Sequence, residues 1–380
     1  MDRFDLLVVG GGINGAAIAR DAAGRGLKVL LVEKDDLAAH TSSASSKLAH
    51  GGLRYLERYE FRLVAESLAE REVLLRNAPH IVRPLRFILP HAPGMRPWWM
   101  IRLGLLLYDA LAIRGSLKRS RGVARGDAVR EPLQDGARRR LLSYWDAWVD
   151  DARLVALNAL DAAERGAQVW TRTALLSARR EGDAWRAQLS DGRSVSAAAI
   201  VNAAGPWVAE VLGARLAGES RARARLVKGS HIVVPSLFDG DHGYILQQPD
   251  GRIVFALPFE GATMIGTTDV AATGPDDERP SPEEIAYLCA AANRAFVRKI
   301  SPADLIWSYG GVRALWDDGA ADAQSVSRDY RLELDPSPGA KLLSVYGGKI
   351  TTARALASEA LDLLGAGGLK FTRTTALPGG

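Results

Sequence analysis

The sequence predicts a mixed α/β fold, in which a parallel sheet flanked by helices carries an inserted antiparallel sheet. Three observations support this prediction. A strand–glycine–helix–strand unit opens the chain, two later strands also end in small residues before a helix, and strand-like runs alternate with polar turns over 226–268. A chain of 380 residues is long enough for two domains or for one large domain with an insertion.

The opening unit is predicted from the run of residue types along it. The apolar residues 4–9 predict a buried strand, the alanine-rich stretch 13–26 predicts a helix that ends in glycine, and 27–33 predicts a second strand. This order of elements forms one βαβ unit, whose two strands should lie parallel in the sheet.

Glycines join the first strand to the helix. Gly10, Gly12 and Gly15 fit the pattern G-x-G-x-x-G, in which glycine permits a tight turn, close approach to a pyrophosphate and close packing of helix and strand. Glu33 ends the second strand, where a carboxylate can hold ribose hydroxyls. The alternative is an ordinary glycine turn, but the full context favours a Rossmann-like dinucleotide site. The acid argues against NADP and leaves FAD and NAD open.

Later elements follow the same reasoning. Strands that end in small residues are expected at 194–205 and 341–348, each followed by a helix, and Ser281 with Glu284 forms a capping box at the start of another helix. The remaining predictions are helices over 60–77, 95–114 and 152–166 and strands at 86–90, 167–173, 174–180 and 184–190.

The stretch 95–115 has two interpretations. Its apolar centre, 98–112, is interrupted by Arg102 and Asp109, so it is too short and too charged to span a bilayer comfortably. Two tryptophans and flanking basic residues suit a helix in the membrane interface. A buried helix of the core fits equally well, and the sequence does not decide between them.

Composition narrows the class of protein. Cys289 is the only cysteine, so no intrachain disulfide can form, and no Cys/His cluster suggests a metal site. The net charge of +5 comes with basic clusters near 114–126, 137–140 and 221–225, but no nucleic-acid-binding motif accompanies them. The first strand begins at the N-terminus, so we expect no signal peptide.

The chain resembles the FAD-dependent, membrane-associated glycerol-3-phosphate dehydrogenases within the D-amino-acid-oxidase-like flavoproteins. The most specific match is the block 41–72, TSSASSKLAHGGLRYLERYEFRLVAESLAERE. The other matching motifs are VVGGGINGAAIARDAAGRGLKVLLVEK, WVDDARLV, VNAAGPWV, KGSHIVVP, GTTDV, GGVRAL, RDYRL and GGKITTAR. Members of this family usually continue past LPGG into a C-terminal helical domain, which we expect to be missing here.

The resemblance implies a Rossmann-like FAD-binding domain with an inserted antiparallel-sheet substrate domain. The expected boundaries are 1–80, 151–222 and 316–380 for the FAD-binding domain, 81–150 for a cap or membrane-facing segment, and 223–315 for the substrate-binding sheet.

The resemblance also implies oxidation of sn-glycerol 3-phosphate. Arg54 and Arg313, each after a glycine pair, are the expected phosphate ligands, because guanidinium binds phosphate oxygens bidentately. Lys349 can assist the phosphate or the negative charge of reduced flavin, and Tyr55 can add a hydroxyl. The expected base is His50, with His231 as its rival, because histidine titrates near neutrality.

The FAD contacts implied by the motifs lie in four segments. The diphosphate is expected at the glycine turn, the adenosine ribose at Glu33, and the flavin ring over a small polar loop and beside a helix start. The residues are Gly10, Gly12, Ile13, Asn14, Gly15, Glu33, Ser42, Ser43, Ser46, Lys47, Leu48, Gly205, Gly348, Lys349, Ile350 and Thr351.

Electrons leave such an enzyme for a membrane quinone or for oxygen, and the 95–115 stretch favours the quinone. This places the protein at the cytoplasmic face of the inner membrane, against an anionic lipid surface, and admits a homodimer. The alternatives are a glycerol-3-phosphate oxidase, a related FAD-dependent amino-acid or amine oxidoreductase, and an inert flavoprotein scaffold.

Overall fold

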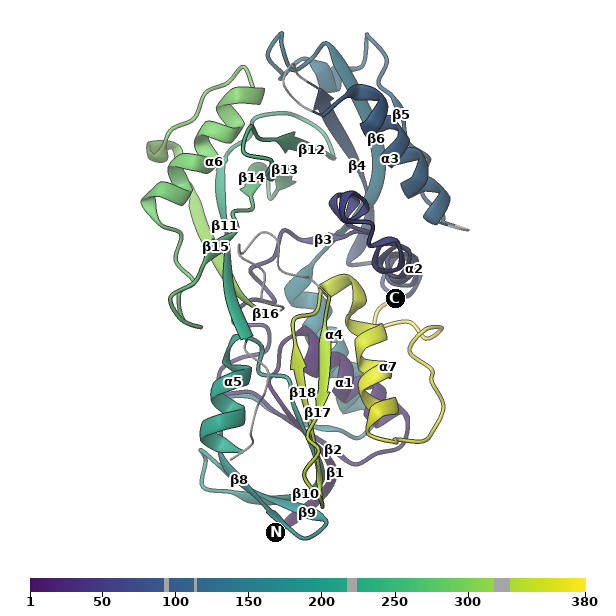
Figure 1. Ribbon diagram of the computed structural model, residues 1–380, viewed down its shortest axis with the longest axis vertical. Helices are drawn as coiled ribbons and strands as arrows, with labels where there is room; N and C mark the ends of the chain where they lie inside the picture. Colours follow the sequence, from purple (N-terminus) through teal and green to yellow (C-terminus); the bar gives the residue numbers. More distant parts are fainter. Residues whose placement is uncertain (92–95, 113–114, 217–223, 318–328) are drawn as a thin grey trace.

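The computed structural model contains two sheets, which form the lower and upper halves of the molecule (Figure 1). It describes residues 1–91, 96–112, 115–216, 224–317 and 329–380, except for the side chains of Arg54 and Arg58. The N-terminus lies at the bottom of the lower half, the C-terminus lies at mid-height beside α2 (Phe61–Asn77), and the chain crosses to the upper half several times (Figure 1).

The lower sheet has eight strands, and its central path runs β17-β18-β10-β1-β2-β7. β1 pairs in parallel with β2 and β10, and β18 pairs in parallel with β10, which confirms the predicted α/β class. β17, β9 and β8 extend this sheet with antiparallel pairs. The strands are β1 (Asp2–Val9), β2 (Val29–Val32), β7 (Gln168–Trp170), β8 (Leu175–Glu181), β9 (Ala184–Leu189), β10 (Ser194–Asn202), β17 (Arg331–Leu334) and β18 (Lys341–Tyr346).

Helices α1 (Ile13–Gly24), α4 (Asp151–Glu164) and α7 (Ala353–Leu363) pack together against this sheet (Figure 1). α1 is rich in alanine, so its backbone can approach its neighbours closely, and its buried residues join those of β1 and β2 in one core. Arg20 of α1 forms a buried ion pair with Asp161 of α4. The pair leaves neither charge unpartnered in the core, as burial requires.

The upper sheet has ten strands in the order β15-β11-β14-β13-β12-β4-β6-β3, with β16 beside β11 and β5 beside β6. All pairs are antiparallel except β12 with β4. The strands are β3 (Leu48–Ala49), β4 (Val82–His91), β5 (Arg121–Gly122), β6 (Arg140–Val149), β11 (Ala224–Pro235), β12 (His242–Gln247), β13 (Ile253–Phe259), β14 (Ala262–Gly266), β15 (Val270–Ala271) and β16 (Trp307–Trp316).

This sheet therefore joins strands from the predicted cap segment to strands from the predicted substrate domain. One of its faces packs on α6 (Pro282–Ala295), which begins with the predicted capping box of Ser281 and Glu284. The other face packs on α2 (Phe61–Asn77) and α3 (Trp98–Leu111). Short helical turns complete the chain: η1 (Leu53–Arg58), η2 (Ala128–Arg130), η3 (Gly205–Trp207), α5 (Val208–Glu210), η4 (Val211–Arg215), η5 (Pro302–Asp304) and η6 (Ile350–Thr352).

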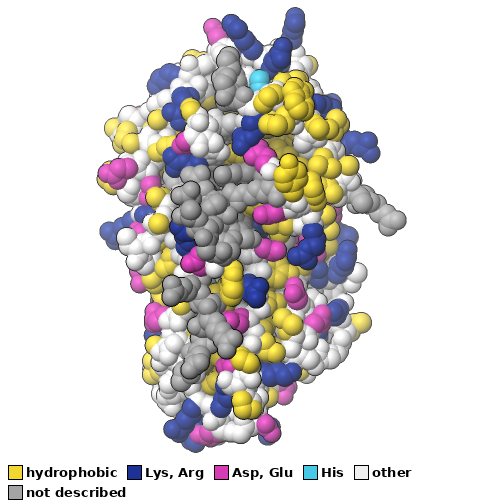
Figure 2. Space-filling view, in the orientation of Figure 1, with side chains coloured by type: hydrophobic (Ala, Val, Ile, Leu, Met, Phe, Trp, Pro, Cys, Tyr) yellow, Lys and Arg dark blue, Asp and Glu magenta, His cyan; other side chains and the backbone are white. Residues whose placement is uncertain are grey.

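α3, which lies within the 95–115 stretch, has one buried and one exposed face. Ile101, Leu105 and Tyr108 are buried against the upper sheet and α2. On the other face Trp99 is 67% exposed and Leu103 58% exposed, and hydrophobic side chains gather over this part of the surface in Figure 2. Among the described residues, none of the helices is long and apolar enough to cross a bilayer.

Candidate functional site

The glycine turn lies where β1, β2 and β10 end, and steric crowding explains its composition. A side-chain carbon at Gly15 would lie 1.9 Å from the carbonyl oxygen of Gly10, and one at Gly10 would lie 2.5 Å from that of Ala203. Gly10 also has a φ of +109°, which other residues rarely adopt. The two glycines therefore let α1, β1 and the end of β10 meet backbone to backbone.

Glu33 is fixed beside this turn by two backbone groups. The N–H of Gly11 donates to Oε2 at 2.6 Å, and the N–H of Asp35 donates to Oε1 at 2.8 Å. Each carboxylate oxygen can accept more than one hydrogen bond, so capacity remains for the hydroxyls of a ribose.

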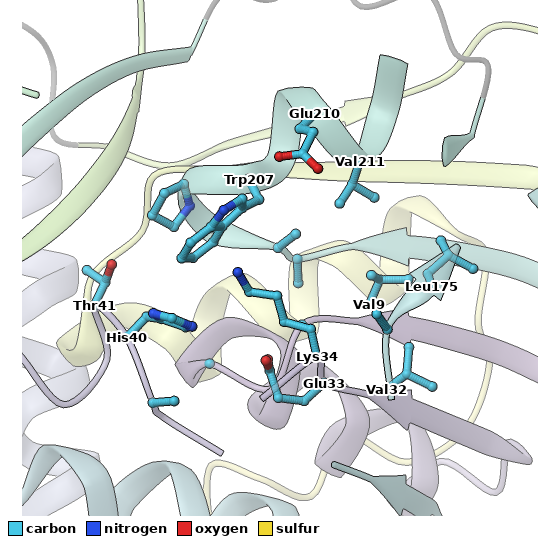
Figure 3. Close-up of a pocket in the computed structure, with 18 of the residues that line it drawn as sticks. Val9, Val32, Glu33, Lys34, His40, Thr41, Leu175, Trp207, Glu210 and Val211 are labelled. Carbon is cyan, nitrogen blue, oxygen red and sulfur yellow. The ribbon is translucent and has the colours of Figure 1, made fainter. Parts of the chain in front are cut away.

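A cavity of about 230 Å³, the first cavity, opens above the turn (Figure 3). Val9, Val32, Leu175 and Val211 form its apolar wall. Charged and aromatic groups form the other side: Lys34 Nζ lies 3.6 Å from the centre of a Trp207 ring, and the His40 ring contacts Trp207 edge-on at 4.6 Å. The His40 nitrogens lie 2.7 Å from an Asp35 oxygen and 3.0 Å from a Glu278 oxygen. A flat base between apolar and aromatic walls, with its ribose at Glu33, fits this shape.

Sequence reasoning missed Lys34, His40 and Trp207. Trp207 stands in the quoted motif VNAAGPWV and Lys34 ends the quoted motif VVGGGINGAAIARDAAGRGLKVLLVEK, but neither motif shows where these side chains point. Gly205 lines the first cavity with a φ of +55°.

The predicted polar loop and the predicted helix start meet the same turn. Ser42 Oγ accepts the N–H of Ile13 at 3.0 Å, and Asn14 Nδ2 donates to the carbonyl of Gly347 at 3.0 Å. Asn14 Oδ1 is buried and has no hydrogen-bond partner among the residues that the structure describes, and a carbon at Gly348 would lie 2.8 Å from Asn14 Nδ2. The start of α1 is thus locked to the loop after β18, and an orphaned acceptor remains there for a ligand.

Three residues of the polar loop contact the protein itself. Lys47 Nζ pairs with Asp151 Oδ1 of α4 at 2.6 Å and donates to the Ser43 carbonyl at 3.2 Å. Leu48 lies in β3, where it pairs with Trp148. These contacts fix the path of the loop.

A larger cavity of about 630 Å³, the second cavity, lies between η1, α3 and the upper sheet. It brings together groups that are far apart in the chain. Its polar lining is Ser46, His50, Tyr55, Glu57, Tyr59, Arg96, Tyr144, Gln247, Thr267, Asp269 and Arg313, and its apolar lining includes Leu89, Met100, Ile101, Leu103, Leu107, Ile245, Ile253 and Phe255.

Arg313 projects from β16 and is 30% exposed. Its Nη2 lies 3.1 Å from Asp269 Oδ1. A carbon at Gly229 would lie 2.6 Å from this Nη2 and 2.6 Å from Thr267 Oγ1, so Gly229 leaves space for both groups. Thr267 and Asp269 stand in the quoted motif GTTDV, although the sequence did not single them out.

Lys349 approaches the second cavity from the loop after β18. Its Nζ is buried, has no hydrogen-bond partner within the described part of the chain, and lies 3.9 Å from the centre of the Tyr55 ring. A buried ammonium without a counter-charge is costly, so this position favours an anionic ligand. Arg54 lies in η1 next to Tyr55, and its side chain is outside the described part of the structure.

The two candidate histidines have different surroundings. His50 lines the second cavity half-buried, its backbone N–H donates to Thr351 Oγ1 at 3.2 Å, and burial lowers its pKa below the usual value. His231 is buried behind Ser46, whose Oγ lies 2.8 Å from His231 Nε2, and its ring stacks on Tyr309 at 4.8 Å. Burial, with Arg313 and Lys47 nearby, lowers the pKa of His231 to about 3. Both rings are neutral at pH 7, but His50 is the one that lines the cavity.

Comparison with known proteins agrees with this geometry. The model of the family described as FAD dependent oxidoreductase matches residues 5–359. The chain is 54% identical over 388 residues to a glycerol-3-phosphate dehydrogenase of Pseudomonas aeruginosa, covering 99% of this chain and 75% of that protein. It is 51% identical over 389 residues to D-erythritol 1-phosphate dehydrogenase of Brucella abortus, covering 99% and 77%.

Solved structures resemble the whole chain. The glycerol-3-phosphate dehydrogenase from Bacillus halodurans, solved with FAD, superposes with a TM-score of 0.74 at 27% identity, covering 100% of this chain and 68% of that one. The L-alpha-glycerophosphate oxidase from Mycoplasma pneumoniae, with FAD bound, gives a TM-score of 0.73 at 18% identity over 96% and 95% of the chains, and supports the fold alone.

Proposed function

The chain belongs to the FAD-dependent oxidoreductase family and uses FAD, and on that premise we propose that it oxidises sn-glycerol 3-phosphate to dihydroxyacetone phosphate. The observation that carries this proposal is the second cavity, which His50 and Arg313 line together with Tyr55, whose ring lies 3.9 Å from the buried Lys349 ammonium. A secondary alcohol that carries a phosphate dianion needs a base and fixed cations, and this cavity supplies both types of group.

The described residues fit FAD. The crowded glycines leave backbone N–H groups at the start of α1 for the diphosphate, Glu33 holds the ribose, and the first cavity takes the adenine. When bound, FAD supplies the acceptor for the hydride of the substrate. Ser46, which lines the second cavity, and Gly348, Ile350 and Thr351, in and before η6, are the contacts that we propose for the flavin ring.

Arg313, with Arg54 and Lys349, binds the substrate phosphate. Guanidinium forms charge-assisted, bidentate hydrogen bonds with phosphate oxygens. Asp269 holds Nη2 of Arg313 and fixes the direction in which its remaining donors point. Tyr55, under the Lys349 ammonium, adds a hydroxyl at the same end of the cavity.

His50 takes the proton from the substrate hydroxyl. Burial keeps its pKa below the usual value, so the ring is neutral and able to accept a proton at pH 7. His231 is the weaker candidate, because its Nε2 is engaged by Ser46 and it does not line the cavity. We assign it to the support of Ser46.

The proposal predicts that sn-glycerol 3-phosphate bleaches the visible absorbance of the bound flavin in the absence of oxygen. Anaerobic titration of the purified flavoprotein measures this directly, with glycerol and inorganic phosphate as controls that each lack half of the substrate. Bleaching by an amino acid in place of the phosphate ester would contradict the proposal, and flavin that only dithionite reduces would indicate an inert scaffold.

A second substrate is favoured by one relative and by the size of the cavity. The Brucella relative is named for D-erythritol 1-phosphate, and the second cavity contains an additional polar group, Gln247 of β12. The same titration with that ester, compared by limiting rate and half-saturating concentration, decides which phosphate ester is preferred.

We propose a membrane quinone as the electron acceptor, at the cytoplasmic face of the inner membrane. The support is the exposed apolar face of α3, with the adjoining Met100 and Leu107 at the second cavity, which suits an enzyme lying on an anionic bilayer (Figure 2). Mixing the reduced enzyme with oxygen or with a short-chain quinone separates a dehydrogenase from an oxidase, since the two differ in the rate of reoxidation.

Substituting Gly15 with alanine should weaken the binding of FAD. The added carbon would lie 1.9 Å from the Gly10 carbonyl, so the turn must open, and we expect FAD affinity to fall about tenfold or more, which corresponds to about 1.4 kcal/mol or more. Equilibrium dialysis or flavin fluorescence measures the affinity. Gly136→Ala is the matched control, because no atom lies within 4 Å of the added carbon; equal flavin retention by both variants would refute the steric argument.

A further inference from the structure

We propose that Tyr108 of α3 is a positioning residue for His50, an inference that rests on the proposed role of His50 as base. Tyr108 is 2% exposed and lies on the buried face of α3. Its hydroxyl accepts the backbone N–H of Gly51 at 2.8 Å. The residue that follows the base is therefore anchored to the same helix that lines the second cavity.

A buried ion pair fixes the direction of this hydroxyl. Tyr108 donates to Asp146 of β6, whose two oxygens lie 2.8 and 3.0 Å away, and Arg71 Nη1 of α2 donates to Asp146 at 2.7 Å. A hydroxyl has one proton and two lone pairs. Because its proton points to Asp146, its lone pairs are directed toward Gly51. Burial and Asp146 raise the pKa of Tyr108 well above its usual range, so it remains a donor.

Steric fit shows that the contact is close-packed. A side-chain carbon at Gly51 would lie 2.6 Å from the Tyr108 oxygen and 2.7 Å from the side chain of Leu68. Only a residue without a side chain lets the hydroxyl reach the backbone here. On the other side, the backbone N–H of His50 is held by Thr351 at 3.2 Å. Two successive N–H groups, those of His50 and Gly51, are thus fixed by separate elements.

The ion pair of Arg71 with Asp146 also affects the pKa of His50. Burial lowers the pKa of His50, Asp146 opposes this effect, and Lys349 and Arg71 lower it further. Removing the Tyr108 hydroxyl takes a donor from Asp146 and an acceptor from Gly51. We therefore expect both the placement of His50 and its proton affinity to change, whereas the proposed phosphate ligands Arg313 and Lys349 make no hydrogen bond to Tyr108, Asp146 or Arg71 within the described part of the chain.

The test is Tyr108→Phe in the full-length holoenzyme. We expect the limiting rate of anaerobic flavin reduction by sn-glycerol 3-phosphate to fall about five- to fiftyfold, with the half-saturating concentration within about twofold of wild type. Tyr244→Phe is the matched control, since its buried hydroxyl donates to the Val129 carbonyl at 2.7 Å and contacts His242, away from the cavity. Equal reduction rates for the two variants would overturn the proposal.

A second measurement does not depend on the substrate. With only six histidines in the chain, histidine-labelled protein gives an NMR titration in which His50→Ala identifies the His50 signal. The midpoint of His50 should rise by about half a unit or more in Tyr108→Phe, because Asp146 is less compensated, and should not move in Tyr244→Phe. If the substrate fails to reduce even wild type, the proposed function fails and this titration alone decides the role of Tyr108.

A third variant covers loss of folding. If Tyr108→Phe yields no flavin-containing protein, Gly51→Ala disturbs the same contact from the other side, because the added carbon would lie 2.6 Å from the Tyr108 oxygen. The same slower reduction with little change in the half-saturating concentration is expected, and a normal reduction rate would contradict the proposal.

Discussion

Replacing His50 with alanine should slow reduction of the flavin by sn-glycerol 3-phosphate by about 10²- to 10⁴-fold, the usual contribution of a general base. Affinity should change little, because the phosphate ligands remain. Stopped-flow reduction under anaerobic conditions, over a range of substrate concentrations, separates the two effects. His80→Ala is the control, since His80 is exposed and lines neither of the two cavities.

The pH dependence provides the second signature of this base. Burial lowers the pKa of His50, so the neutral ring persists below the ordinary titration range of histidine and becomes protonated only in more acidic solution. The reduction rate of wild type should therefore be level near neutrality and fall as the pH drops through the lowered pKa. His50→Ala should lose this acidic limb, whereas His231→Ala should retain it. The opposite pattern would transfer the role to His231.

Replacing Arg313 with alanine should mainly weaken substrate binding. The loss of charge-assisted hydrogen bonds to phosphate costs about 2–3 kcal/mol, which raises the half-saturating concentration about thirty- to a hundredfold. The carboxylate of Asp269, which lies 3.1 Å from Nη2 of Arg313 in the wild type, is no longer screened by this guanidinium and adds repulsion toward the phosphate. The limiting reduction rate should stay within about fivefold of wild type, because the base and cofactor are untouched.

Two comparisons make the Arg313 result specific. Arg313→Lys keeps the charge but not the bidentate geometry and should recover part of the affinity. Arg193→Ala removes another arginine paired with an aspartate, Asp191, whose Oδ2 lies 2.8 Å from Arg193 Nε, outside both cavities, and should leave affinity unchanged. A large fall in limiting rate with normal affinity for Arg313→Ala would place this guanidinium at the reacting carbon instead of the phosphate.

Local patterns predicted the parts of the fold that depend on local sequence. The β1–α1–β2 unit follows from an apolar strand, crowded glycines and an alanine-rich helix, and the capping box at Ser281 was found where its spacing placed it. Local patterns did not predict which strands form the upper sheet. β4 and β12 lie about 150 residues apart and pair in parallel, and strand alternation does not reveal which distant strand is the neighbour.

The candidate site shows the same division. The motifs indicated Arg313, Lys349 and both histidines, but a motif does not give the depth at which a side chain lies. The motifs could not show that His231 is buried behind Ser46, whereas His50 lines the second cavity. Tyr108 stood in an apolar stretch that fitted a surface or core helix equally well, and its contact with Gly51 depends on folding of three separate elements.

The two faces of α3 have a practical consequence for the assay of this protein. One face holds the backbone beside His50 through Tyr108, and the opposite face exposes Trp99 and Leu103 to the surroundings. A surfactant that coats or tilts this helix should therefore alter the first half of the catalytic cycle as well as the delivery of electrons. Each detergent then forms its own complex with the protein, so rates should be compared only between samples that contain the same detergent.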